Sequence, residues 1–453
     1  MSYPVKRSNS LAKPVAVRMA AAAAAAVALT LASGSAQALS LVEAYEKARL
    51  HDPVYRSAFY ANEAGKEYRV LGRSNLLPSI SGSYAASKNR ADIDNGRGVV
   101  HPKYNSHSGN VSLRQAIFNL DAYARYRQGK AQSDASAAQF DADGQALILR
   151  VVGAYIEALF ADDQVALAVA SRDMFLEQNK VNATLFKKGE GTKTDMLETQ
   201  AKLDLSEAKL LEAKDAQLAA RTTLGAIIGD EVTSLDSLTT AFRVRPADKS
   251  GFEAWKEAAL ARNPELKAQV FSIEIARAEV LKARAGHSPR LDFVATYAKN
   301  DSETINTLEQ KSTVRSVGVQ LNVPMYAGGS VNAASRQAVA NQERARADLE
   351  GKTNKVLLDL RKDYDSVASS VTRIEALVKA VESAKLLITA TTQSIKGGVR
   401  INLDLLNAQE QLYVAQRDLA QARYTYLLGT LRLRAGSGAL SSDDVREIAS
   451  NFR

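Results

Sequence analysis

Landmarks in the first half of the chain recur in the second half at an almost constant offset. Asp52-Pro53 returns as Asn263-Pro264 and Pro78 returns as Pro289, in both cases 211 residues later. The same spacing, within three residues, relates Lys88-Asn89 to Lys299-Asn300, Leu113 to Leu321, Phe118 to Tyr326, and Gly189, Asp195, Leu197, Gln200 and Leu203 to Gly398, Asp404, Leu406, Gln409 and Leu412. A register held across separated blocks indicates a duplicated unit of about 210 residues. We therefore expect two structural repeats, residues 39–245 and 246–453.

The first 38 residues, 1–38, have the organisation of a cleaved export signal. Four basic residues and no acids come first, an apolar run follows, and Ala36-Gln37-Ala38 supplies the small residues of a cleavage site. An uncleaved anchor helix is the alternative, but the apolar run of about 14 residues is shorter than the roughly 20 that span a bilayer. We expect cleavage after Ala38. No later stretch approaches about 18 apolar residues, so we expect no transmembrane helix.

Composition argues against catalysis and against a nucleic-acid partner. The chain has no cysteine, which excludes disulfides, thiolate chemistry and a lipid anchor on an N-terminal cysteine. None of the histidines, His51, His101, His107 and His287, has a second ligand at metal-binding spacing. Four basic residues belong to the export segment, so the remainder is near charge balance, with both signs interspersed. We expect no enzyme activity, no cofactor, no metal site and no nucleic-acid binding.

Each repeat is expected to run helix, strand, strand, long helix, helix. Residues 41–76 are helical in pattern apart from a break at Asp52-Pro53, and Pro78 ends the pattern. Alternation of apolar with polar residues then indicates half-buried strands. Strands are expected at 79–87, 111–117, 291–298 and 317–323, as two isolated hairpins whose polar loops cover 89–110 and 300–314.

Two proline-free stretches, 120–186 and 331–395, predict helices about 100 Å long at 1.5 Å per residue. The second carries apolar residues at alternating spacings of three and four, which is typical of coiled-coil packing. They are Leu357, Leu360, Tyr364, Val367, Val371, Ile374, Val378, Val381 and Ile388. The helices that follow keep a seven-residue period, with Met196, Leu203, Leu210, Gln217 and Leu224 in the first repeat and Leu405, Leu412, Leu419, Tyr426 and Leu433 in the second.

Four strands with one apolar face fit a membrane only as part of a larger assembly. Nothing in lipid satisfies the free N–H and C=O groups of a sheet edge. Four strands are also too few to close a barrel. We therefore expect several copies to share one barrel, with the polar strand faces lining water.

Short segments spread over the chain resemble one known family. They are Tyr45-Glu46-Lys47-Ala48-Arg49, Leu76-Leu77-Pro78, Gly286-His287-Ser288-Pro289-Arg290-Leu291-Asp292, Val323-Pro324-Met325-Tyr326-Ala327-Gly328-Gly329 and Ala422-Arg423-Tyr424-Thr425-Tyr426-Leu427. Taken in order, they resemble the TolC-like outer-membrane channel proteins of efflux and type I secretion, over residues 39–446.

The resemblance implies a mainly α protein with a transmembrane β portion. The expected assembly is a homotrimer, whose 12-stranded β-barrel in outer-membrane lipid continues into a long coiled-coil α-helical barrel in the periplasm. The implied partners are a periplasmic adaptor (membrane fusion) protein and an inner-membrane transporter. The implied function is passive exit through the outer membrane. A periplasmic coiled-coil adaptor or scaffold that does not span the membrane is the alternative, and it would need additional β-rich domains.

The resemblance also implies a gate at the periplasmic end. The family's tunnel-closing arginine falls on Arg400 and its partners fall on Thr194-Asp195, whereas the tyrosine that assists them is replaced by Ile395. The acids of the narrowest point fall on Asp404 and on Asn407, so one of two acidic positions is lost. Independently of the family, Arg400 and Asp404 share a helix face at spacing i,i+4. The alternative is that these residues are solvated turn charges.

Overall fold

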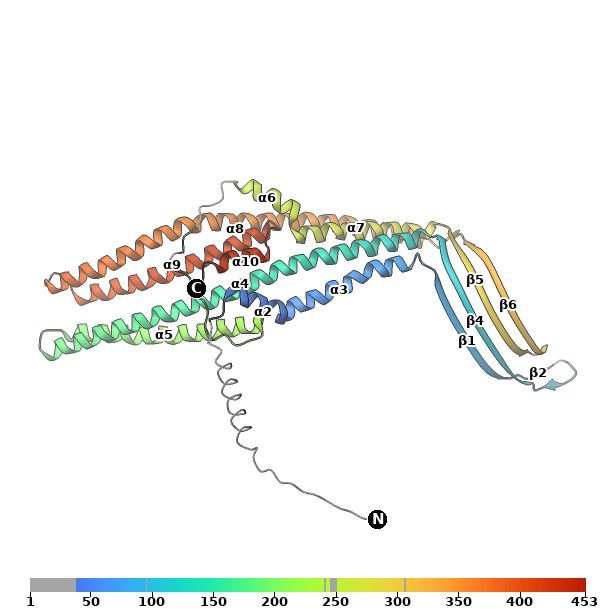
Figure 1. The fold of residues 1–453 in the computed structure, drawn as a ribbon, viewed down its shortest axis with the longest axis horizontal. Helices are drawn as coiled ribbons and strands as arrows, with labels where there is room; N and C mark the ends of the chain where they lie inside the picture. Colours follow the sequence, from blue (N-terminus) through green and yellow to red (C-terminus); the bar gives the residue numbers. More distant parts are fainter. Residues whose placement is uncertain (1–37, 95, 240–241, 245–250, 305–306) are drawn as a thin grey trace, which may run out of the picture.

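The computed structural model describes residues 38–453 except 95, 240–241, 245–250 and 305–306 (Figure 1). The expected export segment therefore lies outside the described residues, apart from Ala38. The expected boundary between the repeats, at residues 245 and 246, also lies outside them. The described chain is elongated, with long helices at one end and a sheet at the other (Figure 1).

The described helices form two similar series. The first series comprises α2 (Leu41–His51), α3 (Pro53–Ser74), α4 (Leu120–Lys187) and α5 (Lys193–Ile228). The second comprises α6 (Gly251–Arg262), α7 (Pro264–Arg284), a short 3₁₀ turn η1 (Ala285–His287), α8 (Ser330–Lys396), α9 (Asn402–Gly436) and α10 (Ser442–Ala449). The expected long helices are present, since α4 has 68 residues and α8 has 67.

The duplicated Asx-Pro pair starts the second helix of each series. The Asp52 carboxylate accepts hydrogen bonds from the backbone N–H groups of Val54 and Tyr55, at 3.4 and 3.2 Å. Asn263 caps α7 in the same way. In both helices proline occupies the first position, where its missing N–H costs no hydrogen bond. The sequence break at Asp52-Pro53 is therefore a local stop and restart.

The long strands form a single antiparallel sheet. Its order is β1 (Ser79–Arg90), β4 (Lys103–Phe118), β5 (Arg290–Thr304) and β6 (Thr307–Asn322). Because β4 pairs with β5, the sheet joins the two series, and the expectation of two isolated hairpins is wrong. Within the described residues β1 and β6 are the two edges. A small hairpin of β2 (Ile93–Asp94) and β3 (Val99–Val100) lies in the first connection.

The strands are longer than the apolar alternation indicated. Much of the polar segments 89–110 and 300–314, expected as loops, lies in the ladders: Asn89 is opposite Tyr104, and Asp301 is opposite Lys311. The expectation failed because main-chain hydrogen bonds hold a ladder together whatever the side chain. A polar end of a strand therefore carries no apolar signal.

Helices α3, α4, α7 and α8 lie side by side in the same order as the strands that they adjoin (Figure 1). The first pair packs closely at glycines. A Cβ atom on Gly129 would lie 2.2 Å from the Tyr68 carbonyl oxygen, and one on Gly72 would lie 2.8 Å from that of Arg125. Any larger residue at Gly129 must therefore push α3 away from α4.

The main core lies midway along the helices and closes around Tyr155, which is fully buried. Its hydroxyl donates to the Leu39 carbonyl at 2.8 Å, and burial raises its pKa well above the usual value. Leu39 forms a bridge with Leu235, while Arg453 and Ser237 exchange backbone hydrogen bonds at 2.9 and 3.0 Å. The start of the described chain, the segment between the series and the C-terminus therefore meet at one place, which we call the terminal clasp.

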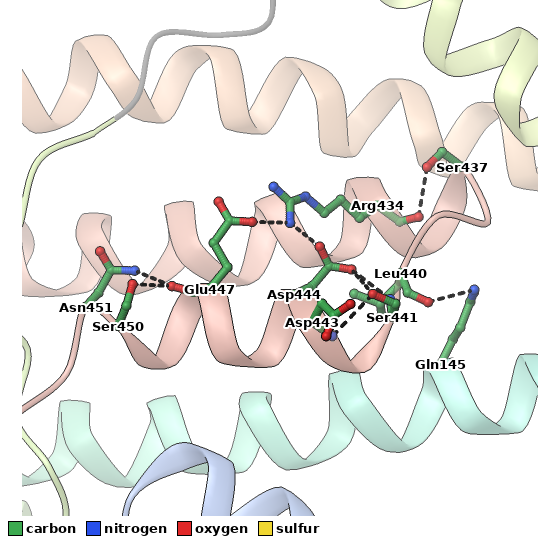
Figure 2. A network of polar contacts seen from close by, with 10 residues as sticks. All are labelled: Gln145, Arg434, Ser437, Leu440, Ser441, Asp443, Asp444, Glu447, Ser450 and Asn451. Atoms are coloured by element: carbon green, nitrogen blue, oxygen red, sulfur yellow. Dashed lines mark hydrogen bonds and ion pairs between the residues drawn. The ribbon is translucent and has the colours of Figure 1, made fainter.

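The C-terminal helix α10 is held to this core by polar contacts (Figure 2). The Arg434 guanidinium bridges Asp444 and Glu447, the latter at 2.8 Å. Asp444 also closes a capping box with Ser441. From α4, the Gln145 amide donates to the Leu440 carbonyl at 3.3 Å. These contacts position the last residues beside Tyr155.

One described helix, α4, is long and apolar enough to cross a membrane by length and composition. Half of its apolar window is buried within the protein. Leu147, Val151 and Tyr155 lie in the core described above. The apolar character of α4 is thus explained by packing between the two series.

The predicted heptad seams are buried in part. On α8, Leu360, Ile374 and Val381 are buried, and the remaining predicted positions are half-buried in the single chain. On α5, Leu203, Leu210 and Leu224 are buried. Of the other two predicted α5 positions, Met196 is half-buried, and Gln217 bonds Asp162 of α4 at 2.8 Å.

Candidate functional site

The residues singled out in the sequence lie at two helical tips, at the end of the molecule farthest from the sheet (Figure 1). One tip is the turn between α4 and α5, and the other is the turn between α8 and α9. Gly189 and Gly398 occupy equivalent places in the two turns, with φ of +77° and +72°. This left-handed conformation favours glycine over other residues.

The first tip is stabilised by its own residues. Thr192 caps α5, because its hydroxyl oxygen accepts from the Asp195 N–H at 3.1 Å. The Asp195 carboxylate in return accepts from the Thr192 hydroxyl at 2.6 Å and from its N–H at 3.4 Å. This is a capping box, an arrangement that satisfies donors at a helix start. The neighbouring Thr194 is exposed.

The second tip starts its helix without such a cap. Ile401 stands at the N-cap position of α9, and no side chain bonds to the free N–H groups there. Arg400 lies 3.8 Å from Asp404, but it stands in the turn before α9, so the expected shared helix face is wrong. Both side chains are more than a third exposed, so this pair contributes little by itself. Asn407 is exposed on the next turn.

Within the described residues of a single chain, Arg400 makes no ion pair with Asp195. Their proximity in the sequence-derived gate stays a prediction, as does the constriction at Asp404 and Asn407. The exposed Arg400 side chain remains accessible to another copy of the protein.

A buried polar cluster joins the second tip, at the start of α9, to the hairpin formed by α4 and α5. The Gln178 amide donates to the Asn402 side-chain oxygen at 2.9 Å, and Asn402 donates to the Thr199 hydroxyl at 3.3 Å. Asn182 donates to the same hydroxyl at 2.6 Å, and both Asn182 and Thr199 are buried. These residues were not predicted from the sequence. The signal was available, because Thr199 is a polar residue three positions after Met196 in the heptad pattern.

Two further contacts reinforce the junction. Leu406 of α9 is fully buried against Phe175 of α4 and Leu203 of α5. Farther along α9, the Glu410 carboxylate accepts hydrogen bonds from Lys202 and, at 3.3 Å, from Lys209. The bond from Lys202 is the main reason that the pKa of Glu410 lies below its usual value.

The sheet has two faces of opposite character. On the serine face, hydroxyl pairs cross between β1 and β4: Ser81 with Ser112 at 2.9 Å and Ser87 with Ser106 at 2.6 Å. The opposite, apolar face carries large exposed side chains. They are Ile80, Tyr84, Val111, Tyr297, Val317, Val319 and Leu321. Such a face requires a covering of lipid or protein.

Comparison with known proteins identifies the family. A model of the outer membrane efflux protein family matches residues 44–230 and again residues 255–439. The chain belongs to the outer membrane efflux protein family. The repeated match agrees with the repeated order of helices and strands.

Curated relatives span nearly the same length. The chain is 40% identical to the alkaline protease secretion protein AprF of Pseudomonas aeruginosa, over 92% of this chain and 88% of AprF. It is 33% identical to the proteases secretion protein PrtF of Dickeya chrysanthemi, over 92% of each. The outer membrane protein TolC of Escherichia coli is 28% identical over 90% of this chain and 84% of TolC.

Solved structures confirm the fold. The outer-membrane channel OprN superposes with a TM-score of 0.77 at 19% identity, covering 88% of this chain and 90% of OprN. CusC, described as forming a transmembrane channel, gives a TM-score of 0.78 at 13% identity, over 89% of this chain and 93% of CusC.

The family establishes the function in outline. The chain is an outer-membrane channel component of secretion and efflux, with a periplasmic helical portion, and is not an enzyme. The alternative of a periplasmic adaptor or scaffold is not favoured. Because the helical portion is periplasmic, the hairpin ends of the sheet point away from the periplasm (Figure 1).

Proposed function

We propose that this protein is the exit duct of a type I system that secretes proteins, for which proteases are the first cargo to test. The observation that best supports this proposal is the 40% identity to a protein named for alkaline protease secretion, which extends over most of both chains. A second relative named for protease secretion is 33% identical over the same share. The duct itself is passive and conducts cargo from an inner-membrane transporter.

The working form is a homotrimer. The sheet leaves β1 and β6 as edges within the described chain, and an edge in lipid costs several kcal/mol for each unpaired backbone group. Pairing β6 of one copy with β1 of the next satisfies both edges, and three copies make a 12-stranded barrel. In the same arrangement α8 of one copy adjoins α3 of the next, which continues the wall as a coiled-coil helical barrel.

The serine face then lines the aqueous lumen and the apolar face contacts outer-membrane lipid. At the periplasmic end, an adaptor protein and the transporter bind the helical tips. Arg400, with Asp195 and Thr194 supplied across the closed ring, holds that end shut. Asp404 forms the cation-selective ring there, beside Asn407. Residues 1–38 are removed during export, and 39–245 and 246–453 are the two repeats.

Oligomeric state and secretion together test this function. The full-length mature protein in detergent should have the mass of three copies by light scattering, and a monodisperse folded monomer would contradict the trimer. In a cell that lacks its own duct, co-expression with an adaptor, a transporter and a type I protease substrate should place the protease in the medium. Protease retained in cells that contain trimers would contradict the cargo assignment.

The topology predicts which positions reach the cell surface. Cysteines introduced by Asn95→Cys, at a position outside the described residues, and by Asp301→Cys, near the end of β5, should react with an impermeant maleimide on intact cells. A cysteine at Val399, in the second helical tip, should react only after the outer membrane is opened. Labelling in the reverse order would overturn the orientation.

A further inference from the structure

The outer end of the sheet carries its charges on one face. Tyr84 and His107 stack on the apolar face, with ring centres 6.3 Å apart, and the strands alternate from there. The Arg315 guanidinium lies 5.7 Å from the centre of the Tyr297 ring, which places it on the same face. Continuing the alternation toward the hairpin ends gives the basic rim, which comprises Lys88, Arg90, Lys103, Lys299, Lys311 and Arg315.

The basic rim is exposed and has little acidic compensation. All of its residues are exposed in the single chain. They project from the face of the sheet, so pairing of the sheet edges between copies leaves them exposed. Where side chains are described at this level of the apolar face, one acid is present: Asp301 lies 3.5 Å from Lys311. Glu303 and Glu309 come nearer the β5–β6 turn, and Asp92 and Asp94 lie in the β1–β4 connection; all four positions are beyond the rim.

The serine face at the same level is uncharged. The residues that alternate with the rim are Ser87, Asn89, Tyr104, Ser106, Asn300 and Ser312. Charges needed only for solubility are equally well solvated on a face that lines a water-filled lumen. Their confinement to the apolar face therefore indicates a ligand on that side of the sheet.

On β5 the rim begins where the apolar side chains end, whereas on β6 Arg315 lies opposite the last of those apolar side chains, Tyr297. On β5, Leu291, Phe293, Ala295 and Tyr297 precede Lys299 on the same face. Leu291 and Lys299 are separated by roughly 27 Å along the strand at about 3.4 Å per residue. Because barrel strands tilt by about 35–45°, this corresponds to roughly 20 Å along the membrane normal, compared with an apolar band about 25 Å tall in outer-membrane barrels. The rim consequently lies at the level of the lipid headgroups, on the side away from the periplasm.

We propose that the basic rim binds the phosphate groups of anionic lipids in the outer leaflet. The assignment rests on the membrane orientation given by the proposed function. Lysine and arginine form charge-assisted hydrogen bonds with phosphate oxygens. Each basic residue close to an anionic lipid surface strengthens the binding of that lipid roughly fivefold. The apolar band directly below the rim receives the acyl chains of the same lipid.

Lipid retention by the purified trimer tests the proposal. The wild-type protein, loaded with diphosphoryl lipid A and washed in neutral detergent, should keep the lipid, as measured by native mass spectrometry. The variant Lys88→Gln/Lys103→Gln/Lys299→Gln/Arg315→Gln should keep at least about tenfold less. Dephosphorylated lipid A should bind both proteins equally weakly. Equal retention of the phosphorylated lipid by the two proteins would overturn the proposal.

A charge-relocation variant separates the site from net charge. Lys88→Gln/Lys299→Gln removes two rim cations, and adding Ser87→Lys/Asn300→Lys returns two cations to the serine face of the same strands. We expect lipid retention to stay low in the four-residue variant. Recovery to the wild-type level would show that net charge alone governs binding and would overturn the rim assignment.

Two further measurements distinguish lipid from free phosphate as the ligand, and separate failure of this inference from failure of the proposed function. Inorganic phosphate at millimolar concentration should not displace lipid A, because inorganic phosphate lacks the acyl chains. Displacement would show that the rim binds anions in general and would overturn the lipid assignment. Light scattering and bilayer conductance are measured on the same samples. If wild-type trimers insert and conduct but retain no lipid A, this inference fails alone, whereas absence of trimers or conductance contradicts the proposed function.

Discussion

The two helical hairpins, α4–α5 and α8–α9, end differently although they share sequence landmarks at a constant offset of 209 residues, such as Gly189 and Gly398. At the first tip, Thr192 and Asp195 close a capping box around the start of α5. At the second tip, Ile401 occupies the same position and offers no side-chain cap. The start of α9 is held instead by tertiary contacts, such as the bond between Asn402 and Gln178. One helix start is therefore stable by itself, and the other is stable only when it is docked.

This difference indicates which of the two helical hairpins is more able to move when the closed end opens. A self-capped helix keeps its first turn when its neighbours separate, whereas an uncapped start loses order when its contacts are lost. A duct that is closed at one end needs an element with two positions. The tip of the α8–α9 hairpin, docked through a few polar groups and Leu406, fits that requirement better than the tip of α4–α5.

The largest effect is expected from removing the apolar contact between the hairpins. Leu406→Ala should destabilise the docked second hairpin by about 2–5 kcal/mol, because Leu406 is fully buried against Phe175 and Leu203. Hydrogen exchange should accelerate over 402–412 and not over 193–203. The matched control is Leu197→Ala, since Leu197 holds the equivalent position in the first repeat and is 54% exposed. Equal acceleration in both segments would remove the distinction between the hairpins.

The next effect concerns the exposed charges of the second tip. Arg400→Ser should raise single-channel conductance in planar bilayers severalfold, because the proposed partners of Arg400 in the closed ring are left unpaired. Asp404→Ala should weaken block by divalent or trivalent cations, and Asn407→Asp should strengthen it by adding a second acid. Unchanged conductance and block in all these variants would make the residues ordinary solvated turn charges.

One substitution at each tip exchanges the capping behaviour of the two helix starts. Ile401→Thr recreates at 401 and 404 the Thr-x-x-Asp pattern of the first tip, and should stabilise the start of α9 by about 1 kcal/mol. Thr192→Ala should destabilise the start of α5 by a similar amount. Exchange rates at the two helix starts measure both changes. Ile401 is 63% exposed, so little packing is lost; failure of Ile401→Thr to slow exchange would show that capping does not limit this tip.

The smallest effect is electrostatic. Lys202 lowers the pKa of Glu410, so the pair stabilises the junction above the ordinary glutamate pKa, and this stabilisation is lost as pH falls through the lowered value. Because both side chains are partly exposed, we expect less than about 1 kcal/mol from Glu410→Gln at neutral pH. The exchange difference between wild type and Glu410→Gln should vanish in acid. A difference that persists in acid would indicate a role other than charge.

Local signals in the sequence predicted most of the helical architecture. Pro53 and Pro264 mark helix starts, and the heptad positions around Leu360 and Leu203 mark buried seams. The pairing of β4 with β5 was not predictable in this way, because it joins segments about 180 residues apart and depends on how the helices deliver the strands. The polar strand ends were missed for lack of an apolar signal.

The candidate site was predictable to a lesser degree. The sequence predicted that Arg400 lies beside Asp404 and the structure shows that contact, but Arg400 stands in the turn before α9 and does not share a helix face with Asp404. The capping box of Thr192 with Asp195 was also readable as a local pattern, although the sequence analysis did not use it. The cluster of Asn182, Thr199 and Asn402 requires knowledge of which helices meet, and a single sequence does not contain that information.

The terminal clasp has a consequence for biogenesis. Tyr155 is enclosed by Leu39, by the segment between the repeats and by the last residues of the chain, including Phe452. The core therefore cannot finish assembling until residues 451–453 have been translated and have crossed the inner membrane. Export thus delivers an incomplete, translocation-competent polypeptide, and arrival of these residues is the event that commits it to its final shape.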